Sequence, residues 1–125
     1  MRQILILILS VLLSQNVVAR SFKVNITPDG ESSLTVFLPQ SQQSAGRMVI
    51  ILPGGAYQTL AMQSEGTDWA PYFNARGIAV GVLKYRMPHG DRRIPISDAF
   101  AAMQMAHDSA KTWHVNVNDI GIMGS

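Results

Sequence analysis

The sequence predicts an open, three-layer α/β sheet, and two observations carry this prediction. Two continuous apolar runs rich in β-branched residues, at positions 48–52 and 78–83, are typical of strands that are covered on both faces. A short helix is expected between these runs and a longer one after the second, so strands and helices alternate along the chain.

An antiparallel edge hairpin is expected ahead of the first run. Residues 22–26 alternate between apolar and polar side chains, residues 27–30 (Thr-Pro-Asp-Gly) form a turn signal, and residues 34–38 resume the extended pattern. Residues 40–46 are polar and separate this hairpin from the rest of the sheet. The hairpin therefore adds antiparallel strands to a sheet that is otherwise expected to be mostly parallel.

The two expected helices follow from apolar spacing and from their end signals. A short helix is predicted over residues 69–76 with Gly77 marking its end, which makes a right-handed parallel crossover between the two apolar runs. A longer helix is predicted over residues 96–113, with Ser97 and Asp98 capping its first turn. Steps of three and four residues predict a buried face on this helix made of Phe100, Met103, Ala106, Ala110 and Trp113.

The first 19 residues are typical of a secretory signal peptide. Arg2 supplies the charged start, residues 4–13 are apolar, and residues 17–19 (Val-Val-Ala) form a small-residue end. The apolar run is shorter than the ~20 residues needed to cross a bilayer, which disfavours a membrane anchor, the alternative interpretation. We therefore expect export to the periplasm or the extracellular space, with residues 20–125 forming part of one domain.

Charge and composition narrow the classes of partner. The chain has 10 basic and 8 acidic residues, so nothing predicts a nucleic acid or an anionic membrane surface as partner. It has no cysteine, which excludes disulfides, thiolate metal sites and a cysteine nucleophile within this sequence. His89 and Asp91 lie close in sequence, but two further ligands at recognisable spacing are lacking, so no metal site and no cofactor are predicted.

A glycine-rich loop directly follows the first apolar run. Its sequence is Pro53-Gly54-Gly55-Ala56-Tyr57, and in open α/β sheets the functional loops lie at the carboxyl ends of the strands. Glycines let the backbone turn sharply and present N–H groups that can stabilise a developing negative charge on a carbonyl oxygen. A plain tight turn is the alternative. A phosphate-binding loop is disfavoured because neither of its glycine motifs is present.

The end of the sequence predicts a second functional loop. Residues 120–125 (Ile-Gly-Ile-Met-Gly-Ser) are typical of a buried strand that runs into a Gly-x-Ser-x-Gly nucleophile elbow. Gly124 takes the position of the first glycine and Ser125 that of the variable residue, so the nucleophilic serine is expected at the next position, beyond this sequence. The elbow and the Pro53–Tyr57 loop are expected to face each other.

With both loops in view, the chain resembles the α/β-hydrolase superfamily, and within it the secreted acetylxylan and feruloyl esterases. Segments that carry the resemblance lie at residues 49–57, 65–66, 69–70, 76–80, 83–88, 95–99 and 120–125. The resemblance implies the N-terminal part of an α/β-hydrolase three-layer sandwich, cut at the elbow. It also implies a parent serine esterase that deacylates plant-wall polysaccharide, whereas this stretch by itself should be inactive.

The resemblance assigns the oxyanion hole to the backbone N–H groups of Gly55 and Ala56. Members often carry His-Gly-Gly-Gly in this loop, whereas here Pro53 replaces the histidine and Ala56 the last glycine. Alanine still supplies an N–H donor if its backbone angles are ordinary. The proline argues against the lipase-like branch and suits the carbohydrate esterases.

The triad of this fold follows the chain order serine, acid, histidine, so residues ahead of the elbow are not expected in it. This applies to His89, His107, His114, Asp91, Asp98 and Asp108. Surface or helix-end roles are expected for the second and third histidines, and a plain turn or a substrate contact for the first.

Aromatic residues are candidates for the wall of a sugar cleft, because they combine apolar area with a polar tip. Tyr57 is the preferred substrate-binding candidate, Tyr85 is a further one, and Trp69 is expected in the core. Arg86 and Asp98 are expected to form a structural ion pair.

Two other functions stay open at this point. An exported peptidase of the prolyl-oligopeptidase type shares the sheet and the elbow, and fold alone does not settle the substrate. A non-catalytic binding protein on a degenerate hydrolase sheet belongs to a different class. The residue after Ser125 would separate catalysis from binding.

Overall fold

The structure is a computed structural model that describes residues 17–125. The predicted signal peptide lies almost wholly outside these residues, so its cleavage and export stay predictions. Within the described part, no helix is both long and apolar enough to cross a membrane.

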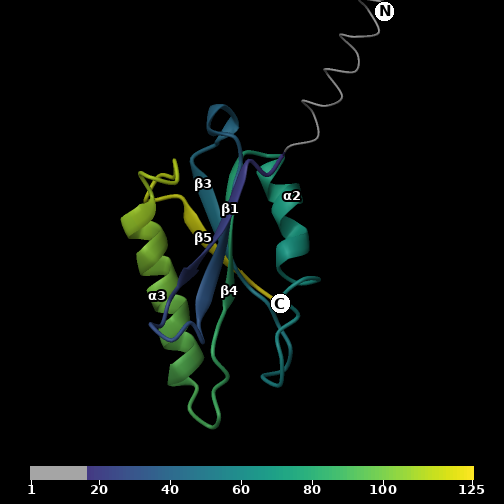
Figure 1. Cartoon of the computed structure of the whole chain (residues 1–125), viewed down its shortest axis with the longest axis vertical. Coiled ribbons are helices and arrows are strands. Elements are labelled where there is room, and N and C mark those ends of the chain that lie inside the picture. Colours follow the sequence, from purple (N-terminus) through teal and green to yellow (C-terminus); the bar gives the residue numbers. More distant parts are fainter. Residues whose placement is uncertain (1–16) are drawn as a thin grey trace, which may run out of the picture.

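Five strands form a single sheet with a helix on each side (Figure 1). The elements in chain order are β1 (Arg20–Asn25), β2 (Ser33–Leu38), η1 (Ser41–Gln43), β3 (Arg47–Leu52), η2 (Thr67–Trp69), α2 (Ala70–Asn74), β4 (Ile78–Lys84), α3 (Arg93–Ser109) and β5 (Ile120–Gly124). The strand order across the sheet is β1-β2-β4-β3-β5. The predicted α/β class, the N-terminal hairpin and both apolar strands are confirmed.

The sheet is mixed, with an antiparallel half and a parallel half. β1 pairs with β2 and β2 with β4 in antiparallel fashion, whereas β3 pairs with both β4 and β5 in parallel. The parallel half holds the carboxyl ends of β3 and β5 side by side. This half therefore positions the two loops that the sequence singles out.

The core fills both faces of β3 and β4. Ile50 and Ile51 are consecutive, point to opposite faces of the sheet and are both fully buried. Ile50 packs in the cluster beneath α3, and Ile51 packs with Val80 and Val82 beneath α2. Burial on both faces explains why these strands are apolar throughout instead of alternating.

The short helix α2 is tied to the sheet by one side chain. Asn74 is buried, and its amide nitrogen donates to the carbonyls of Phe37 and Ile78 at 3.2 and 2.8 Å. Gly77 ends the segment with a φ of +75°, as its predicted role as a helix stop requires. The expectation that Trp69 lies in the core is wrong: it is 42% exposed and stacks against Tyr72 on the outer side of the helix.

The longer helix starts earlier than predicted, and its buried face differs in part. α3 begins at Arg93, and its buried residues include Asp98, Ala102 and Ala106. Phe100, expected inside, is 73% exposed. The side of the helix with Ala102 and Ala106 lies against the sheet, because small side chains allow close approach. Asp98 is buried on this side and is held by an ion pair with Arg86. Of the other predicted face residues, Met103 is half-buried, and Ala106, Ala110 and Trp113 are buried.

Because α3 begins at Arg93, Ser97 and Asp98 lie too far along the helix to cap its first turn, and the predicted capping roles are wrong. The Ser97 hydroxyl donates to the carbonyl of Ile94 at 2.7 Å inside the first turns, and Asp98 points into the core. Arg92 occupies the N-cap position without a side-chain capping bond, and the carboxylate of the preceding Asp91 accepts a hydrogen bond from the Arg93 N–H at 3.0 Å.

The final strand is only partly buried among the described residues. β5 pairs with β3 on one side, and Ile122 is 52% exposed. Burial of this strand in the longer protein stays a prediction.

Candidate active site

The parallel pairing of β3 and β5 places the two predicted loops in contact. Leu52 is aligned with Gly124, so the residues that follow each strand leave the sheet at the same edge. A Cβ atom on Gly54 would lie 2.7 Å from the Ser125 backbone oxygen and 3.3 Å from a carboxylate oxygen of Glu65. The structure therefore brings Gly54 and Ser125 together, while their catalytic roles stay predictions.

Gly55 sits where no side chain fits. Its φ is +157°, and a Cβ atom there would lie only 1.9 Å from the carbonyl oxygen of Thr59. The chain turns back at this point, because the N–H groups of Gln58 and Thr59 donate to the Gly55 carbonyl at 3.1 and 3.4 Å. Glycine is required here by close approach of backbone to backbone.

The next two residues adopt a strained backbone. Ala56 and Tyr57 have φ values of +56° and +59°, the left-handed region that costs roughly 1 kcal/mol or more for residues with a Cβ atom. The expectation of ordinary angles at Ala56 is therefore wrong. Such strain persists where the surroundings hold the chain in place, and it occurs often at functional loops.

The loop offers backbone donors that the protein itself does not use. Within residues 17–125, the N–H groups of Gly55 and Ala56 donate to no other residue, although Ala61 N–H donates to the Gly54 carbonyl at 2.9 Å and fixes the base of the loop. Backbone N–H groups are obligatory hydrogen-bonding groups, so unpaired ones at a loop are free to bind a ligand oxygen. Two adjacent free donors are what an oxyanion site needs.

Tyr85 connects the β3–η2 loop to the β4–α3 loop. Its hydroxyl donates to the carbonyl of Pro53 at 2.5 Å. Burial raises the pKa of Tyr85, and the neighbouring Tyr57 and Glu65 raise it further, so the hydroxyl keeps its proton to higher pH. The sequence proposed Tyr85 only as a cleft wall and missed this anchoring bond, although a tyrosine directly after a buried strand was the available signal.

A small hollow lies between the two loops and the start of α3. It measures about 230 Å³, and it is lined by Leu52, Tyr57, Tyr85, Pro95, Ile96, Ala99, Gly124 and Ser125. Tyr57 is 62% exposed, so its ring remains available to a ligand there. The lining is mainly apolar, which suits a small acyl group next to the free N–H groups.

The three histidines lie elsewhere. His89 occupies the β4–α3 loop with a φ of +45° and lines a second, larger hollow on the other side of Tyr85. His107 is on the exposed side of α3, with its Nδ1 3.6 Å from Asp108, and His114 is exposed beyond the helix end. None of the three lines the hollow that contains Ser125.

The predicted ion pair between Arg86 and Asp98 is confirmed. Its closest nitrogen–oxygen distance is 2.8 Å, and the Asp98 carboxylate also accepts the Arg86 backbone N–H at 2.8 Å. The hydrogen bonds that Arg86 donates to the Asp98 carboxylate, together with the charge of that carboxylate, raise the pKa of Arg86. Because Asp98 is 1% exposed and lies on α3, the pair fixes the β4–α3 loop to the helix.

Residues 17–125 contain no cluster of three or more acidic or histidine side chains placed to hold a metal ion. The polar groups that this part of the chain presents at the two loops include the backbone N–H groups of Gly55 and Ala56 and the hydroxyl groups of Tyr57 and Tyr85.

The chain is similar in sequence and in fold to known proteins, although no family model matches it. The sequence is 42% identical over 106 residues to an acetylxylan esterase of Xylanibacter ruminicola, a match that covers 85% of this chain and 22% of the relative. The chain thus spans about a fifth of the length of that curated protein.

Solved structures give the same fold. MGS-M1, an α/β hydrolase from a deep-sea metagenome library of the Medee basin, superposes with a TM-score of 0.74 at 27% identity over 82% of this chain and 45% of its own. The acetyl ester-xyloside bifunctional hydrolase of Caldicellulosiruptor lactoaceticus gives a TM-score of 0.75 at 24% identity, over 86% of this chain and 43% of its own. A truncated carbohydrate esterase from gut microbiota gives 0.73 at 24% identity, over 88% and 40%. The chain therefore has the α/β-hydrolase fold and is a homologue of acetylxylan esterase.

Proposed function

We propose that the protein containing this chain is an exported serine esterase that removes acyl groups, acetyl in the first place and feruloyl as a second possibility, from plant-wall polysaccharide. One observation carries the proposal: the free N–H groups of Gly55 and Ala56 lie on the loop that touches the end of β5, where the elbow motif begins. The homologous acetylxylan esterase supports the choice of bond and substrate.

The proposed reaction follows from this placement. A serine at the elbow attacks the ester carbonyl carbon, and a base removes the hydroxyl proton as the new C–O bond forms. The carbonyl oxygen becomes negatively charged and accepts hydrogen bonds from Gly55 and Ala56 N–H. The C–O bond to the sugar breaks, and the sugar oxygen takes the proton from the base and leaves as a hydroxyl group. Water, deprotonated by the same base, then attacks the acyl-serine and releases the carboxylic acid and the free serine.

The parts of this machinery lie on different stretches of the protein. The chain supplies the oxyanion donors, the strained loop and the start of the elbow at Gly124 and Ser125, and Tyr57 borders the acyl hollow. The nucleophile, the acid and the histidine belong to residues beyond Ser125 in this proposal. We therefore expect residues 1–125 alone to lack esterase activity, and no cofactor to be needed.

The proposal is tested on the full-length protein with three substrates. We expect release of acetate from acetylated xylan and of 4-nitrophenol from 4-nitrophenyl acetate, and no cleavage of short peptide amides. Burst release of 4-nitrophenol would report the acyl-serine intermediate. Cleavage of the peptide amides in preference to the esters would overturn the proposal in favour of a peptidase, and a lack of all three activities would favour a binding protein.

A further inference from the structure

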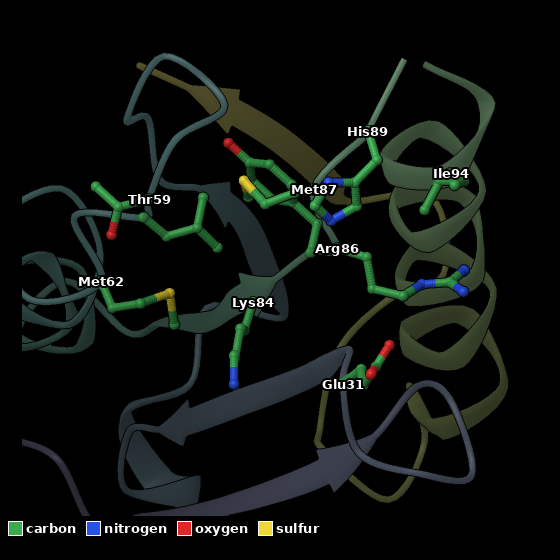
Figure 2. A pocket seen from close by; sticks show the side chains of 10 residues that line it. Glu31, Thr59, Met62, Lys84, Arg86, Met87, His89 and Ile94 are labelled. Carbon is green, nitrogen blue, oxygen red and sulfur yellow. The ribbon is translucent and has the colours of Figure 1, made fainter. Parts of the chain in front are cut away.

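A larger hollow adjoins the acyl hollow across the ring of Tyr85. It measures about 520 Å³ and opens at the carboxyl end of β4, the same end of the sheet as the oxyanion loop (Figure 2). Tyr85 lines both hollows, so a ligand whose acyl group occupies the smaller hollow can extend past Tyr85 into the larger one. The larger hollow is thus placed to receive the alcohol side of the ester.

The polar groups of this hollow have both signs of charge. Lys84 from β4 and Glu31 from the β1–β2 turn both line it, both are exposed, and neither forms a salt bridge among the described residues. Arg86 pairs with Asp98, and the charge of Glu31 also helps to raise the pKa of Arg86. The hollow therefore presents an ammonium donor and a carboxylate acceptor that no salt bridge occupies, with little net charge.

Apolar surface lies beside these charged groups. Figure 2 shows Thr59 and Met62 on one side of the hollow, His89 and Ile94 on the other, and Lys84 between them. The Tyr85 ring completes the wall towards the acyl hollow. A pyranose ring has the same mixture, with hydroxyl groups on its edge and C–H groups on its faces.

This chemistry discriminates between classes of alcohol. An alkyl or aryl alcohol filling the hollow would take Lys84 and Glu31 out of water without hydrogen-bonding them, which is unfavourable. A sugar acid would be attracted by Lys84 but repelled by Glu31. Hydroxyl groups donate to a carboxylate and accept from an ammonium group, so a neutral sugar satisfies both side chains.

Resting on the proposed esterase function, we infer that the hollow lined by Lys84, Glu31 and Tyr85 is the subsite for a neutral sugar residue on the alcohol side of the ester. Lys84 and Glu31 contact the sugar hydroxyls and determine specificity for a carbohydrate alcohol. They take no part in the bond-breaking steps.

The test compares two esters in the full-length protein and its variants. For Lys84→Met and Glu31→Gln we expect kcat/KM for acetylated xylo-oligosaccharides to fall at least tenfold more than kcat/KM for 4-nitrophenyl acetate, whose alcohol is small and apolar. The loss should appear mainly in KM. Lys111→Met is the matched control, because Lys111 is exposed at the opposite end of α3 and should leave both values unchanged.

A binding measurement separates this inference from the proposed function. Calorimetric titration with xylotriose, which has no ester, should show binding that weakens at least tenfold in the Lys84→Met, Glu31→Gln double variant. Binding with this dependence in a protein without esterase activity would retain the subsite and reject the esterase. An active esterase whose variants lose both esters equally, or whose xylotriose binding is unaffected, would overturn the subsite.

Discussion

The loops that follow β3 and β4 leave the same end of the sheet, yet they are built on opposite principles. The β3–η2 loop (residues 53–66) has glycines, two residues with left-handed backbone and free N–H groups. The β4–α3 loop (residues 85–92) also has one left-handed residue, His89, but it is fixed by side-chain bonds: the ion pair between Arg86 and Asp98 of α3, and the hydrogen bond from the Arg93 N–H to Asp91. Tyr85 joins them through its bond to Pro53.

The difference indicates how the strained conformation of the β3–η2 loop is stabilised. Left-handed angles at Ala56 and Tyr57 disfavour the observed conformation of the β3–η2 loop, so its order must come from neighbours. The β4–α3 loop supplies one of those neighbours, because Asp98 holds Arg86 and the adjacent Tyr85 reaches Pro53. One loop thus carries the N–H groups proposed to bind the ester oxygen, and the other provides rigidity.

The largest effect is expected from Gly55→Ala in the full-length protein. The new Cβ atom would meet the Thr59 carbonyl at 1.9 Å, so the loop must move and its N–H groups are displaced. We expect kcat to fall by about 10²–10³, the usual cost of losing an oxyanion donor. Gly121→Ala is the control, since within residues 17–125 no atom lies within 4 Å of a Cβ atom at that position. Equal activity of both variants would remove Gly55 from the oxyanion site.

The next effect is expected from Asp98→Asn, which breaks the anchor of the β4–α3 loop. The free energy of unfolding should fall by roughly 2 to 4 kcal/mol, near the lower part of the range for buried ion pairs because Arg86 remains a third exposed. Urea unfolding of the full-length protein measures this change. Asp108→Asn on the exposed side of α3 is the matched control and should change stability by less than about 0.5 kcal/mol.

A smaller effect is expected from Tyr85→Phe, which removes only the hydroxyl that holds Pro53. The net loss of one such hydrogen bond is about 0.5 to 1.5 kcal/mol. If the bond positions the oxyanion loop, kcat should fall by up to about tenfold with little change in KM, and amide hydrogen exchange at residues 54–57 should become faster. Tyr72→Phe, on the outer side of α2, is the control. Unchanged exchange in the Tyr85 variant would contradict the positioning role.

The smallest effect is expected from Asp91→Asn and depends on pH. Hydrogen bonds from the Arg93 side chain and backbone lower the pKa of Asp91, so its folded pKa lies below the unfolded value near 3.8. Its contribution to stability is therefore present above that value and lost as pH falls through the folded pKa. Melting temperatures of wild type and variant should differ at pH 6 and converge below pH 3. A difference that persists at low pH would show another cause.

The fold could be predicted from the sequence where a local pattern of residues is compatible with only one arrangement of the segment. The double-sided apolar runs predict β3 and β4, and the turn at residues 27–30 predicts the hairpin, as the structure confirms. The patterns fail where two solutions compete. The predicted face of α3 is buried at Ala106, Ala110 and Trp113, but Phe100 is exposed, because the ion pair of Asp98 and the small Ala102 turn the first half of the helix towards the sheet by another side.

The candidate site shows the same division. The glycine loop and the start of the elbow are visible in the sequence because their residue types have few other uses. The Tyr85 bond to Pro53, the placement of Glu65 beside Gly54 and the left-handed angles at Ala56 and Tyr57 join or constrain distant segments, so no local pattern reports them.

By itself, the sequence determined which segments form strands and helices and that the loop after β3 departs from regular backbone, because periodicity and glycine placement act within a few residues. Only the tertiary structure decided that β3 and β5 are parallel neighbours in a register that aligns Leu52 with Gly124. It also decided that Asp98 of α3 is buried and Phe100 exposed. Both outcomes depend on side chains far apart in the chain competing for the same space, and that competition is settled only when the whole sheet is packed.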